Sequence, residues 1–475
     1  MDPRKLQAGD VIDGFRLVGH LPSGGMSSFW RVIRDGSSAP MLMKIPLLRP
    51  GESPLTIIGY EVEQMILPRL SGPHAPRFVA AGDFERPYIV MEYIDGQSVK
   101  SLLEKTPLPP DEVVAVGAKV AFALHDIHRQ HVIHLDLKPS NVILRSDQAV
   151  LIDFGLSRHD QLPDLVQEAE GPVGTGGYIA PEQILGNRSD PRSDLFALGV
   201  ILYFLATGER PYGDPDRVSE WRRRLWRDPV PPRGRIASIP DWLQEIILRC
   251  LEISPDARYA TAAQLAFDLQ HPAQVAITER GRRLKRDGRL TVAWRWLHSR
   301  RDRAPAKTRG LTSHLANAPI IMVAIDLEAG LETLNDAIAL AVGRTLATEP
   351  NARLACVNVR KVARLSLDAL EDAQGRNPHL GRLIELKHWA RTLPIAPERI
   401  TYHVLEGTDA AGQLIDYARN NYVDHIVAGA RGNSTLRRYL GSVSARVVAE
   451  APCSVTVIRS RAHTRVDSDI APHSF

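Results

Sequence analysis

The sequence predicts an α+β bilobal fold followed by a separate α/β domain. Residues 13–95 consist mainly of short apolar runs separated by Gly, Pro and Asp, as expected for strands. Residues 96–272 have mainly helical periodicity, and from residue 316 onward apolar strands alternate with helical stretches. A chain of 475 residues is also longer than one hydrophobic core usually serves, which favours several domains.

The composition is that of a folded protein. Apolar residues make up 44% of the chain and charged residues 24%, which excludes a disordered chain. The three cysteines, Cys250, Cys356 and Cys453, are far apart and lack the CxxC spacing of zinc or redox sites, so we expect a reducing, cytoplasmic location. The N-terminus has no apolar core of a secretory signal, and no apolar run reaches the roughly 20 residues of a transmembrane helix. A transmembrane segment is therefore not expected.

The predicted small lobe, residues 13–95, combines five strand-like runs with one helical stretch. In that stretch Val62, Met65 and Ile66 recur at helical spacing, and Pro68 is expected to bend or end the helix. In the predicted large lobe the clearest amphipathic helix is the stretch VVAVGAKVAFALHDIH. A β-rich lobe thus precedes a helical one.

Residues 273–315 are predicted to form a basic linker between the two domains. The stretch 279–309 holds twelve Lys or Arg residues against three acids, and Trp294 and Trp296 lie beside Arg295. Three interpretations stay open. A solvated linker is favoured over docking on an acidic surface of the first domain, and a contact with anionic membrane or nucleic acid is disfavoured.

The second domain is predicted to span residues 316–460, with a tail at 461–475. Its apolar strands alternate with helical stretches, the pattern of a parallel sheet with crossover helices. The predicted strands are PIIMVAID, RLACVNV, ITYHVL, HIVAGA and SVTVIR.

Three motifs in the first domain have the order and spacing of a phosphoryl-transfer site. Residues 134–141, HLDLKPSN, have the form HxDxxxxN, residues 153–155 are DFG, and residues 180–182 are APE. Phosphoryl transfer needs metal ions and a cation for the phosphates, and a carboxylate that orients the attacking hydroxyl. On these motifs the first domain resembles the protein kinase family, and DLKPSN with GTGGYIAPE is similar to its serine/threonine branch.

The resemblance implies roles for the motif residues. Asp136 would orient the substrate hydroxyl and accept its proton, and Lys138 would steady the γ-phosphate. Asn141 and Asp153 would hold Mg²⁺, with Mn²⁺ as an alternative. The resemblance assigns structural positions in and after the activation segment to Thr175, Glu182, Asp194 and Arg258, with Arg258 placed to pair with Glu182.

The small lobe would supply most of the ATP site. Lys44, on a predicted strand, would position the phosphates while paired with Glu63 on the predicted helix. The backbone of residues 92–94 would contact adenine. The ATP-binding residues that the resemblance implies are Leu21, Gly24, Gly25, Phe29, Lys44, Glu63, Glu92, Ile94 and Asp153.

The glycine-rich loop departs from the family pattern. Pro22 and Ser27 stand where the outer two glycines of GxGxxG are expected. Glycines let backbone amides approach phosphate oxygens closely, so we expect a weakened or reshaped lid.

The activation segment also departs from that pattern. Leu135 stands where the family often has the Arg that captures an activation-loop phosphate. From Asp153 to Glu182 the only hydroxyl residues are Ser157, Thr175 and Tyr178. We therefore hypothesise that the kinase is gated by something other than activation-loop phosphorylation, for example by the second domain.

Residues 316–460 resemble the universal stress protein family, and the resemblance implies an α/β doubly wound, Rossmann-like fold for this domain. The stretch 429–432, GARG, and then GSVS after eight further residues are similar to that family's ATP-binding signature GxxGx9GS, one residue short. Glycines at a strand end and a helix N-terminus suit a triphosphate, although such glycines can also serve only tight turns. The second nucleotide site implied by the resemblance comprises Asp326, Val359, Gly429, Gly432, Gly441, Ser442 and Val443.

The sequence thus favours a serine/threonine protein kinase that transfers the ATP γ-phosphate to protein hydroxyls. Its C-terminal domain would be stress-responsive, bind ATP and act as sensor or dimeriser, with a homodimer formed through the last strand. The alternative is a catalytically weak, kinase-like scaffold that signals by binding nucleotide. The presence of the full residue set favours the enzyme: Lys44, Glu63, Asp136, Asn141 and Asp153. No motif identifies the protein substrate.

Overall fold

The structure is a computed structural model with two compact units, Met1–Ala316 and Asn317–Phe475. Each unit has its own hydrophobic core, and we describe each by itself. The structure describes residues 6–22, 27–36, 39–47, 55–82, 86–160, 162, 164–168, 172–215, 217–286, 288, 292, 295, 319–328, 330–361, 378–396, 399–421, 423–430 and 441–459.

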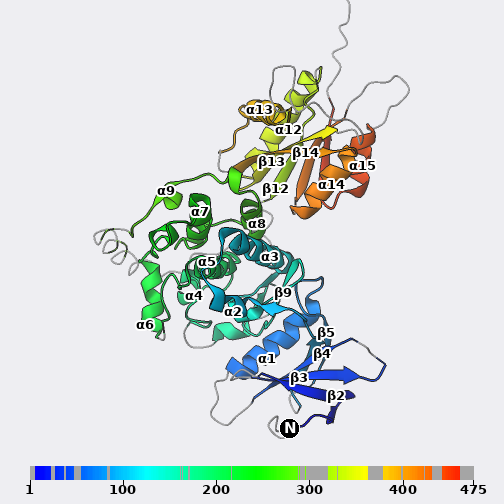
Figure 1. Cartoon of the computed structure of the whole chain (residues 1–475). Helices are drawn as coiled ribbons and strands as arrows, with labels where there is room; N and C mark the ends of the chain where they lie inside the picture. The colour runs from blue at the N-terminus through cyan, green and yellow to red at the C-terminus, as the bar shows by residue number, and fades with distance from the viewer. Residues whose placement is uncertain are drawn as a thin grey trace, which may run out of the picture. The chain divides into compact units, whose positions relative to one another are not determined.

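The small lobe of the first unit is an antiparallel sheet with the strand order β1-β2-β3-β4-β6-β5 and one helix, α1 (Figure 1). One face of the sheet is apolar because side chains alternate along each strand, so that Leu17, Val32 and Met43 are all buried. The periodicity indicated a helix that starts at Tyr60. The helix begins five residues earlier, at Leu55, and ends two residues before Pro68. The elements are β1 (Val11–Ile12), β2 (Phe15–Leu21), β3 (Ser27–Arg34), β4 (Met41–Pro46), α1 (Leu55–Ile66), β5 (Phe78–Ala81) and β6 (Ile89–Glu92).

The large lobe is mainly helical, with α3 and α5 at its centre. Two short sheets, β10-β9-β7 and β11-β8, carry the loops between the helices. The elements are β7 (Gln97–Ser98), α2 (Val99–Leu102), α3 (Pro110–Arg129), β8 (Val132–Ile133), β9 (Val142–Arg145), β10 (Gln148–Leu151), β11 (Arg158–His159), α4 (Pro181–Ile184), α5 (Arg192–Thr207), α6 (Val218–Trp221), α7 (Asp241–Cys250), α8 (Ala262–Gln270) and α9 (Glu279–Arg282).

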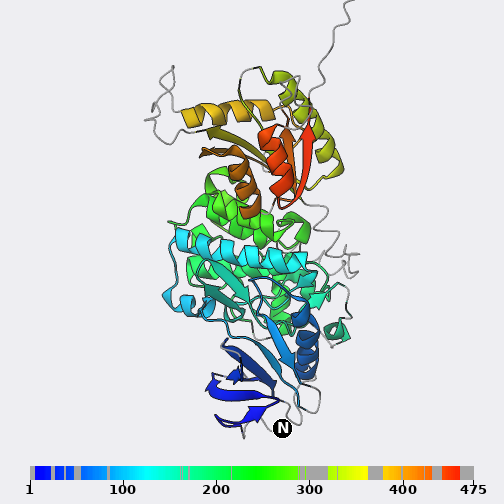
Figure 2. The same ribbon diagram turned by 90° about the vertical axis from the view of Figure 1, so that its right-hand side faces the viewer.

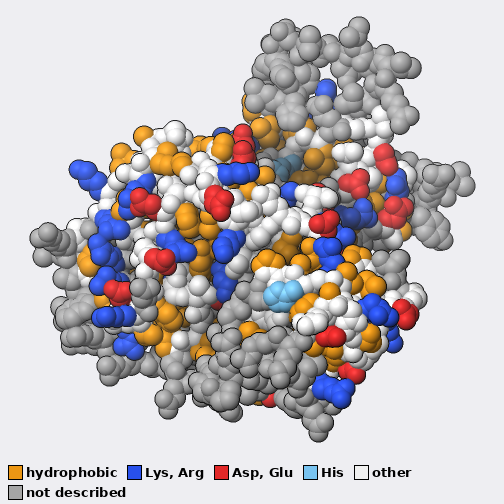
Figure 3. Space-filling view, turned by 60° about the horizontal axis from the view of Figure 1, so that its bottom comes forward, with side chains coloured by type: hydrophobic (Ala, Val, Ile, Leu, Met, Phe, Trp, Pro, Cys, Tyr) orange, Lys and Arg blue, Asp and Glu red, His pale blue; other side chains and the backbone are white. Residues whose placement is uncertain are grey.

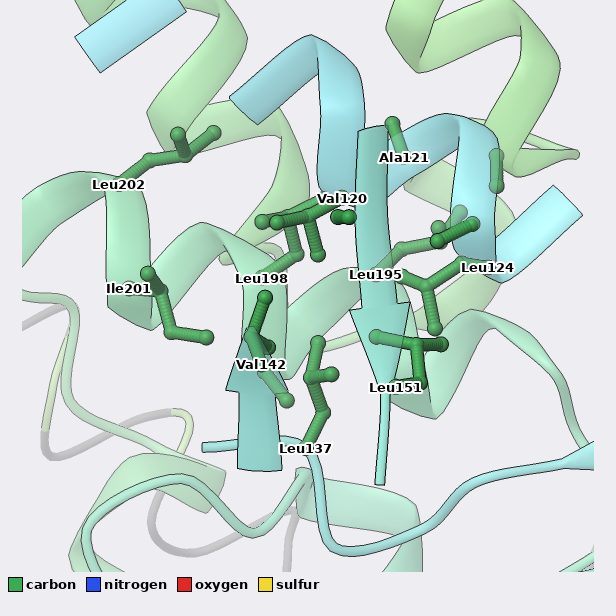
Figure 4. Close-up of a cluster of buried hydrophobic side chains, with 14 of the residues drawn as sticks. Val120, Ala121, Leu124, Leu137, Val142, Leu151, Leu195, Leu198, Ile201 and Leu202 are labelled. Atoms are coloured by element: carbon green, nitrogen blue, oxygen red, sulfur yellow. The ribbon is translucent and has the colours of Figure 1, made fainter. Parts of the chain in front are cut away.

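The core of the large lobe lies directly beneath the HLDLKPSN loop. Figure 4 shows Leu137 of that loop among side chains of α3, α5, β9 and β10, including Leu124, Leu195 and Leu151. Leu137 is 1% exposed. Burial of one leucine side chain contributes roughly 1.5–3 kcal/mol, so this contact anchors the loop to the two helices.

The second unit is a parallel five-stranded sheet with the order β14-β13-β12-β15-β16. Helices cover both faces, as Figures 1 and 2 show. The chain order reverses between β12 and β15, which makes their carboxyl ends the topological switch point of a doubly wound sheet. The elements are β12 (Ile320–Ala324), α12 (Glu332–Thr348), β13 (Arg353–Lys361), α13 (Pro378–Ala390), β14 (Ile400–Gly407), α14 (Ala410–Asn420), β15 (His425–Gly429), α15 (Ser442–Glu450) and β16 (Ser454–Ile458).

Residues 278–283, which we call the docked segment, pack on α7 of the first unit. Gln244 donates from Nε2 to three backbone carbonyls of this segment at 2.8–3.0 Å. Glu245 accepts bonds from the backbone N–H groups of Thr278 and Gly281 and from the guanidinium of Arg280. The interpretation of this part of the chain as a solvated linker is therefore wrong.

Acidic side chains of the large lobe hold further arginines of the same basic stretch. Arg280 pairs with Glu252 at 3.0 Å, and both Arg283 and Arg295 pair with Asp228. These ion pairs agree with the second of the three interpretations, docking on an acidic surface of the first domain. Most of the predicted linker after residue 286, and the tail 461–475, lie outside the described residues.

Two cysteines lie in the cores. Cys250 at the end of α7 and Cys356 in β13 are both fully buried with free thiols. Burial raises the pKa of Cys250 to about 12 and also raises the pKa of Cys356. Neither thiol is therefore a nucleophile in the folded chain.

The face presented in Figure 3 carries Lys and Arg side chains mixed with Asp and Glu, so neither sign dominates it. In the part of the chain that the structure describes, no helix combines the length and the apolar character needed to cross a bilayer.

Candidate active site

Lys44 on β4 and Glu63 on α1 form the centre of the small-lobe half of the site. The Lys44 ammonium lies 2.5 Å from Glu63 Oε2 and 2.8 Å from Asp153 Oδ1. Glu63 is 1% exposed, and its other oxygen accepts a 3.2 Å bond from the backbone N–H of Phe154. Helix α1, strand β4 and the DFG motif are thus joined by one ion-pair network.

Lys44 and Asp153 stabilise each other's charged forms, whereas burial raises the pKa of Glu63. Burial opposes the charged form of Lys44, but the carboxylates of Asp153 and Glu63 outweigh it and raise the Lys44 pKa. The Lys44 ammonium in turn lowers the pKa of Asp153 to about 2, against the smaller opposite effect of burial. Asp153 is therefore ionised at neutral pH.

Two glycines allow α1 to approach the DFG motif. A Cβ on Gly59 would lie 3.4 Å from the backbone oxygen of Gly155, and a Cβ on Gly155 would lie 3.1 Å from the oxygen of Gly59. Side chains at these positions would crowd the two backbones. The close approach keeps Glu63 within reach of both Lys44 and Phe154.

Asp136 is the centre of the large-lobe half of the site. Its Oδ2 accepts a 2.6 Å bond from Lys138 Nζ, and its Oδ1 accepts bonds from Thr175 Oγ1 at 2.6 Å and Thr175 N at 3.0 Å. Asn141 donates from Nδ2 to the Asp136 carbonyl oxygen at 3.0 Å. The carboxylate is thereby fixed between the catalytic loop and the activation segment.

Asp194, at the start of α5, holds the backbone of the catalytic loop from below. It accepts 2.8 Å bonds from the N–H groups of His134 and Leu135, and His128 of α3 lies 2.8 Å from Oδ2. Leu135 has a φ of +62°, a conformation that is costly for a leucine. The Asp194 bonds and burial of the Leu135 side chain stabilise this turn.

The end of the activation segment is held by a buried ion pair. Arg258 donates two bonds, of 2.7 and 2.8 Å, to the carboxylate of Glu182, and Ser193 donates a third at 2.6 Å. The Arg258 side chain is fully buried. A paired and fully hydrogen-bonded charge is stable in such a place, and the geometry fixes the APE motif against α5.

The three hydroxyl residues of the activation segment are all engaged. Ser157 donates to the His134 carbonyl, Thr175 donates to Asp136, and Tyr178 is 5% exposed with Arg210 donating to its oxygen. A carboxylate, Asp164, accepts two bonds from Arg188 at 3.0 and 3.2 Å. The three hydroxyls of the segment are thus all hydrogen-bonded within the protein.

Asn141 and Asp153 fit a divalent cation. Asp153 is ionised and its side chain is 44% exposed. Asn141 donates from Nδ2 to the Asp136 carbonyl, and its Oδ1, which accepts a 3.3 Å bond from Ser140 Oγ, is its acceptor atom. Such hard oxygen ligands suit Mg²⁺. No group of three or more His, Cys, Asp or Glu gathers anywhere in the described ranges.

The remaining predicted ATP residues lie on neighbouring strands. Leu21 pairs with Phe29 across β2 and β3, and Phe29 pairs with Lys44 across β3 and β4. Glu92 ends β6, and its side chain accepts a 2.9 Å bond from Arg145. Ile94 follows it and is buried. Gly24 and Gly25 lie outside the described residues.

The predicted second site gathers at the switch point of the second unit. Asp326 follows β12, and Gly429 ends the neighbouring β15. Gly441 and Ser442 begin α15, whose Ser444 donates a 2.8 Å bond to the Gly429 carbonyl. Val359 lies on β13, on the other side of β12, and Val443 is the second residue of α15. Gly432 lies outside the described residues.

One glycine of this second site has a packing reason. A Cβ on Gly429 would come within 2.9 Å of Leu334 and 3.0 Å of Ile338, both on α12. Gly429 therefore lets α12 lie close to the sheet, whether or not a nucleotide binds.

The edge strand β16 pairs with β15 on one side, and dimerisation through it stays a prediction.

Sequence reasoning missed two residues that shape the main site. Gln183 donates a 2.9 Å bond to the Leu135 carbonyl and so ties the APE helix to the catalytic loop. Arg224 donates to two carbonyls of the activation segment. A glutamine beside a motif and an arginine in a run of three arginines carry no signal of their own in a single sequence.

The chain matches known proteins in both units. The protein kinase domain model matches residues 16–271, and the universal stress protein family model matches residues 318–459. The serine/threonine-protein kinase PknB of Mycobacterium leprae is 36% identical over 185 residues, which are 38% of this chain and 30% of that protein. PknL of Mycobacterium bovis is 31% identical over 268 residues, 56% of this chain and 67% of that protein.

The PknI kinase domain of Mycobacterium tuberculosis, a crystal structure, aligns with 24% identity and a TM-score of 0.44 over 56% of this chain and 99% of that chain. This chain spans under a third of the length of PknB. The matched residues, 16–271, include the ion-pair network, the catalytic loop and the APE helix described above. The chain therefore belongs to the protein kinase family and carries, in addition, a universal stress protein domain.

Proposed function

We propose that this chain is a serine/threonine protein kinase that transfers the γ-phosphate of ATP to protein hydroxyls. The observation that supports this most strongly is the arrangement around Asp136, whose two carboxylate oxygens are held by Lys138 and Thr175. The relatives PknB and PknL are named as serine/threonine kinases, and the matched region includes this arrangement.

Each residue of the site has a physical task in this proposal. Asp136 orients the attacking hydroxyl and accepts its proton, and Lys138, hydrogen-bonded to that carboxylate, offers its cation to the transferred phosphoryl group. Lys44, held by Glu63, binds the phosphates. Mg²⁺, held by Asn141 and Asp153, would neutralise phosphate charge when bound.

Residues 92–94, which we call the hinge, support recognition of adenine by backbone groups. The N–H of Glu92 donates to the Arg77 carbonyl and the N–H of Tyr93 donates to the Pro40 carbonyl. Two of the hinge donors are thus used within the protein. We assign adenine recognition to the Glu92 carbonyl and the Ile94 N–H, which lie on either side of Tyr93.

An Asp136→Asn variant tests the proposal. Loss of the proton acceptor is expected to lower phosphate transfer from γ-labelled ATP, to the chain itself and to a histone mixture, by roughly 10²–10⁴-fold. ATP affinity, measured by calorimetry, is expected to stay within about twofold because Asp136 lies away from the hinge.

Phosphosites mapped on the wild type are expected outside residues 153–182, because the hydroxyls of that segment are engaged.

The matched control is Asp147→Asn, an exposed aspartate in the turn between β9 and β10, which should transfer at the wild-type rate. If wild type and Asp136→Asn both bind ATP and neither transfers phosphate, the weak scaffold is the correct alternative. Pro22 and Ser27, at the edges of the glycine-rich loop, would then be the first positions to revert to glycine.

We further propose that the universal stress protein domain binds a second ATP at its switch point and reports stress to the kinase. The support is the placement of Asp326 beside the end of β15 and near the N-terminal residues of α15. Calorimetry is expected to give two ATP per wild-type chain and one per Asp326→Ala chain. One ATP in both would remove the second site. A cytoplasmic location is part of the same proposal.

A further inference from the structure

The loop of residues 175–179 joins the catalytic carboxylate to the rest of the activation segment. Thr175 bonds Asp136 through both its backbone N–H and its hydroxyl. The N–H groups of Tyr178 and Ile179 both donate to the Thr175 carbonyl, at 2.8 and 3.1 Å. Gly176 and Gly177 lie between them and have no side chains to hold their own conformation.

Arg224 reaches this loop from another part of the large lobe. It lies in the 3-10 turn η6 (Arg222–Leu225), directly after α6. Its guanidinium donates one bond to the Ile179 carbonyl and a second, of 2.6 Å, to the Gly176 carbonyl. One planar fork therefore links the carbonyl of the first glycine to the carbonyl of Ile179, three residues further along the loop.

The environment of Arg224 is unusual for a cation. The residue is 1% exposed, whereas Arg222 and Arg223 beside it are exposed. Its guanidinium carbon lies 5.2 Å from the centroid of the Tyr212 ring. Among the described residues no carboxylate lies within ion-pair distance of it, and burial lowers the Arg224 pKa to about 10.

A buried cation without a carboxylate is costly, so packing alone does not explain it. A leucine or methionine would fill the same space without that cost. What the guanidinium adds is two directed bonds to the loop that carries Thr175. Two further side chains cover the glycines: a Cβ on Gly176 would lie 2.5 Å from the Trp221 indole nitrogen, and one on Gly177 would lie 3.2 Å from Arg210.

We infer that Arg224 is a positioning residue for protein phosphorylation, which holds the loop 175–179 so that Thr175 keeps Asp136 aligned and the substrate hydroxyl can reach it. This inference rests on the proposed kinase function. It predicts that loss of Arg224 impairs the use of protein substrate. Nucleotide binding is expected to stay intact, because Arg224 touches no residue assigned to the ATP site.

The test compares the full chain with Arg224→Met and Arg224→Lys, using the histone mixture as substrate. Arg224→Met is expected to lower kcat/KM for histone at least tenfold and to leave calorimetric ATP affinity within twofold. Arg224→Lys keeps the charge but loses the fork, so an intermediate kcat/KM is expected. The control Arg223→Met removes an exposed guanidinium from the same turn and should match wild type.

Hydrogen exchange separates this inference from the proposed function. The amides of Tyr178 and Ile179 are expected to exchange at least tenfold faster in Arg224→Met than in Arg223→Met, with or without phosphate transfer by the wild type. Unchanged exchange, or a kcat/KM that falls only in proportion to ATP affinity, would overturn the inference. An inactive wild type with faster exchange in Arg224→Met would contradict the kinase proposal but would still support the contact between Arg224 and the loop 175–179. If Arg224→Met does not fold, Arg224→Lys decides on the same two measurements.

Discussion

Asp136 and Lys138 lie on either side of a buried leucine, and this alternation explains how the catalytic loop stays rigid. Leu137 points into the core between α3 and α5 (Figure 4), so the two charged side chains are turned toward Thr175. Asp194 fixes the backbone one turn earlier. The Asp136 carboxylate is therefore supported by Leu137 and Asp194, neither of which has a proposed contact with substrate.

His125 on α3 makes the stability of the kinase unit depend on pH. Burial, helped by Arg129 and His128, lowers its pKa to about 3, whereas the unfolded chain binds the proton with the ordinary value of 6.5. Below pH 6.5 the unfolded state holds more protons, so stability falls as pH drops toward 3. His125→Gln is expected to remove up to roughly 1.4 kcal/mol of this loss per pH unit between pH 6 and 4.

Urea unfolding of the intact chain at several pH values measures this effect. The free energy of unfolding of wild type minus that of His125→Gln should shrink steadily as the pH falls. Parallel curves for wild type and His125→Gln would contradict the assignment.

At the residue scale, the sequence identified the motif residues of the candidate site but not the residues that hold them in place. Residues defined by short motifs, such as Asp136, can be found because their spacing is fixed along the chain. Arg224 cannot be separated from Arg222 and Arg223 in this way, since burial of one arginine in three depends on where Gly176 and Ile179 lie in space. Asp164, which bonds Arg188, is hidden for the same reason.

At the scale of elements, the docked segment extends the kinase unit beyond the motif-bearing region. Its contacts are directed: Glu245 on α7 accepts two backbone N–H groups and one guanidinium from it. Composition alone showed only a surplus of Lys and Arg. The acids that meet this surplus, Asp228, Glu245 and Glu252, come together only in the folded lobe. The sequence therefore favoured a solvated linker where the structure shows a docked segment.

Gly281→Ala tests how much the docked segment contributes. A Cβ there would lie 2.8 Å from the Ile277 side chain and 2.9 Å from the Asp241 carbonyl oxygen, which is backbone and cannot move easily. We expect a loss of about 1–3 kcal/mol in unfolding free energy. Trypsin should also cut faster after Arg280 and Arg282.

Gly288→Ala is the matched control, because a Cβ at that glycine would have no atom of the described residues within 4 Å. It should leave both the unfolding free energy and the cleavage rate unchanged. Equal protease resistance in wild type and Gly281→Ala would mean that the contacts of α9 contribute little.

At the scale of the whole molecule, the sequence predicted both folds. Alternation of apolar residues in β2 to β4 and the repeated strand-helix pattern after residue 316 are local signals, and both sheets follow them. The order of the strands is not local: β12 lies between β13 and β15 because the chain crosses over in one direction and then reverses. Family resemblance, and not periodicity, supplied that part of the prediction.

The buried cysteines give each unit its own chemical reporter. Only a thiolate reacts with iodoacetamide, so Cys250 and Cys356 can be alkylated only while their surroundings are open. One lies in the kinase unit and the other in the universal stress protein unit, and each has a raised pKa when folded. Mass spectrometry of alkylated peptides would therefore follow the opening rates of both units side by side, in the natural chain and without an added label.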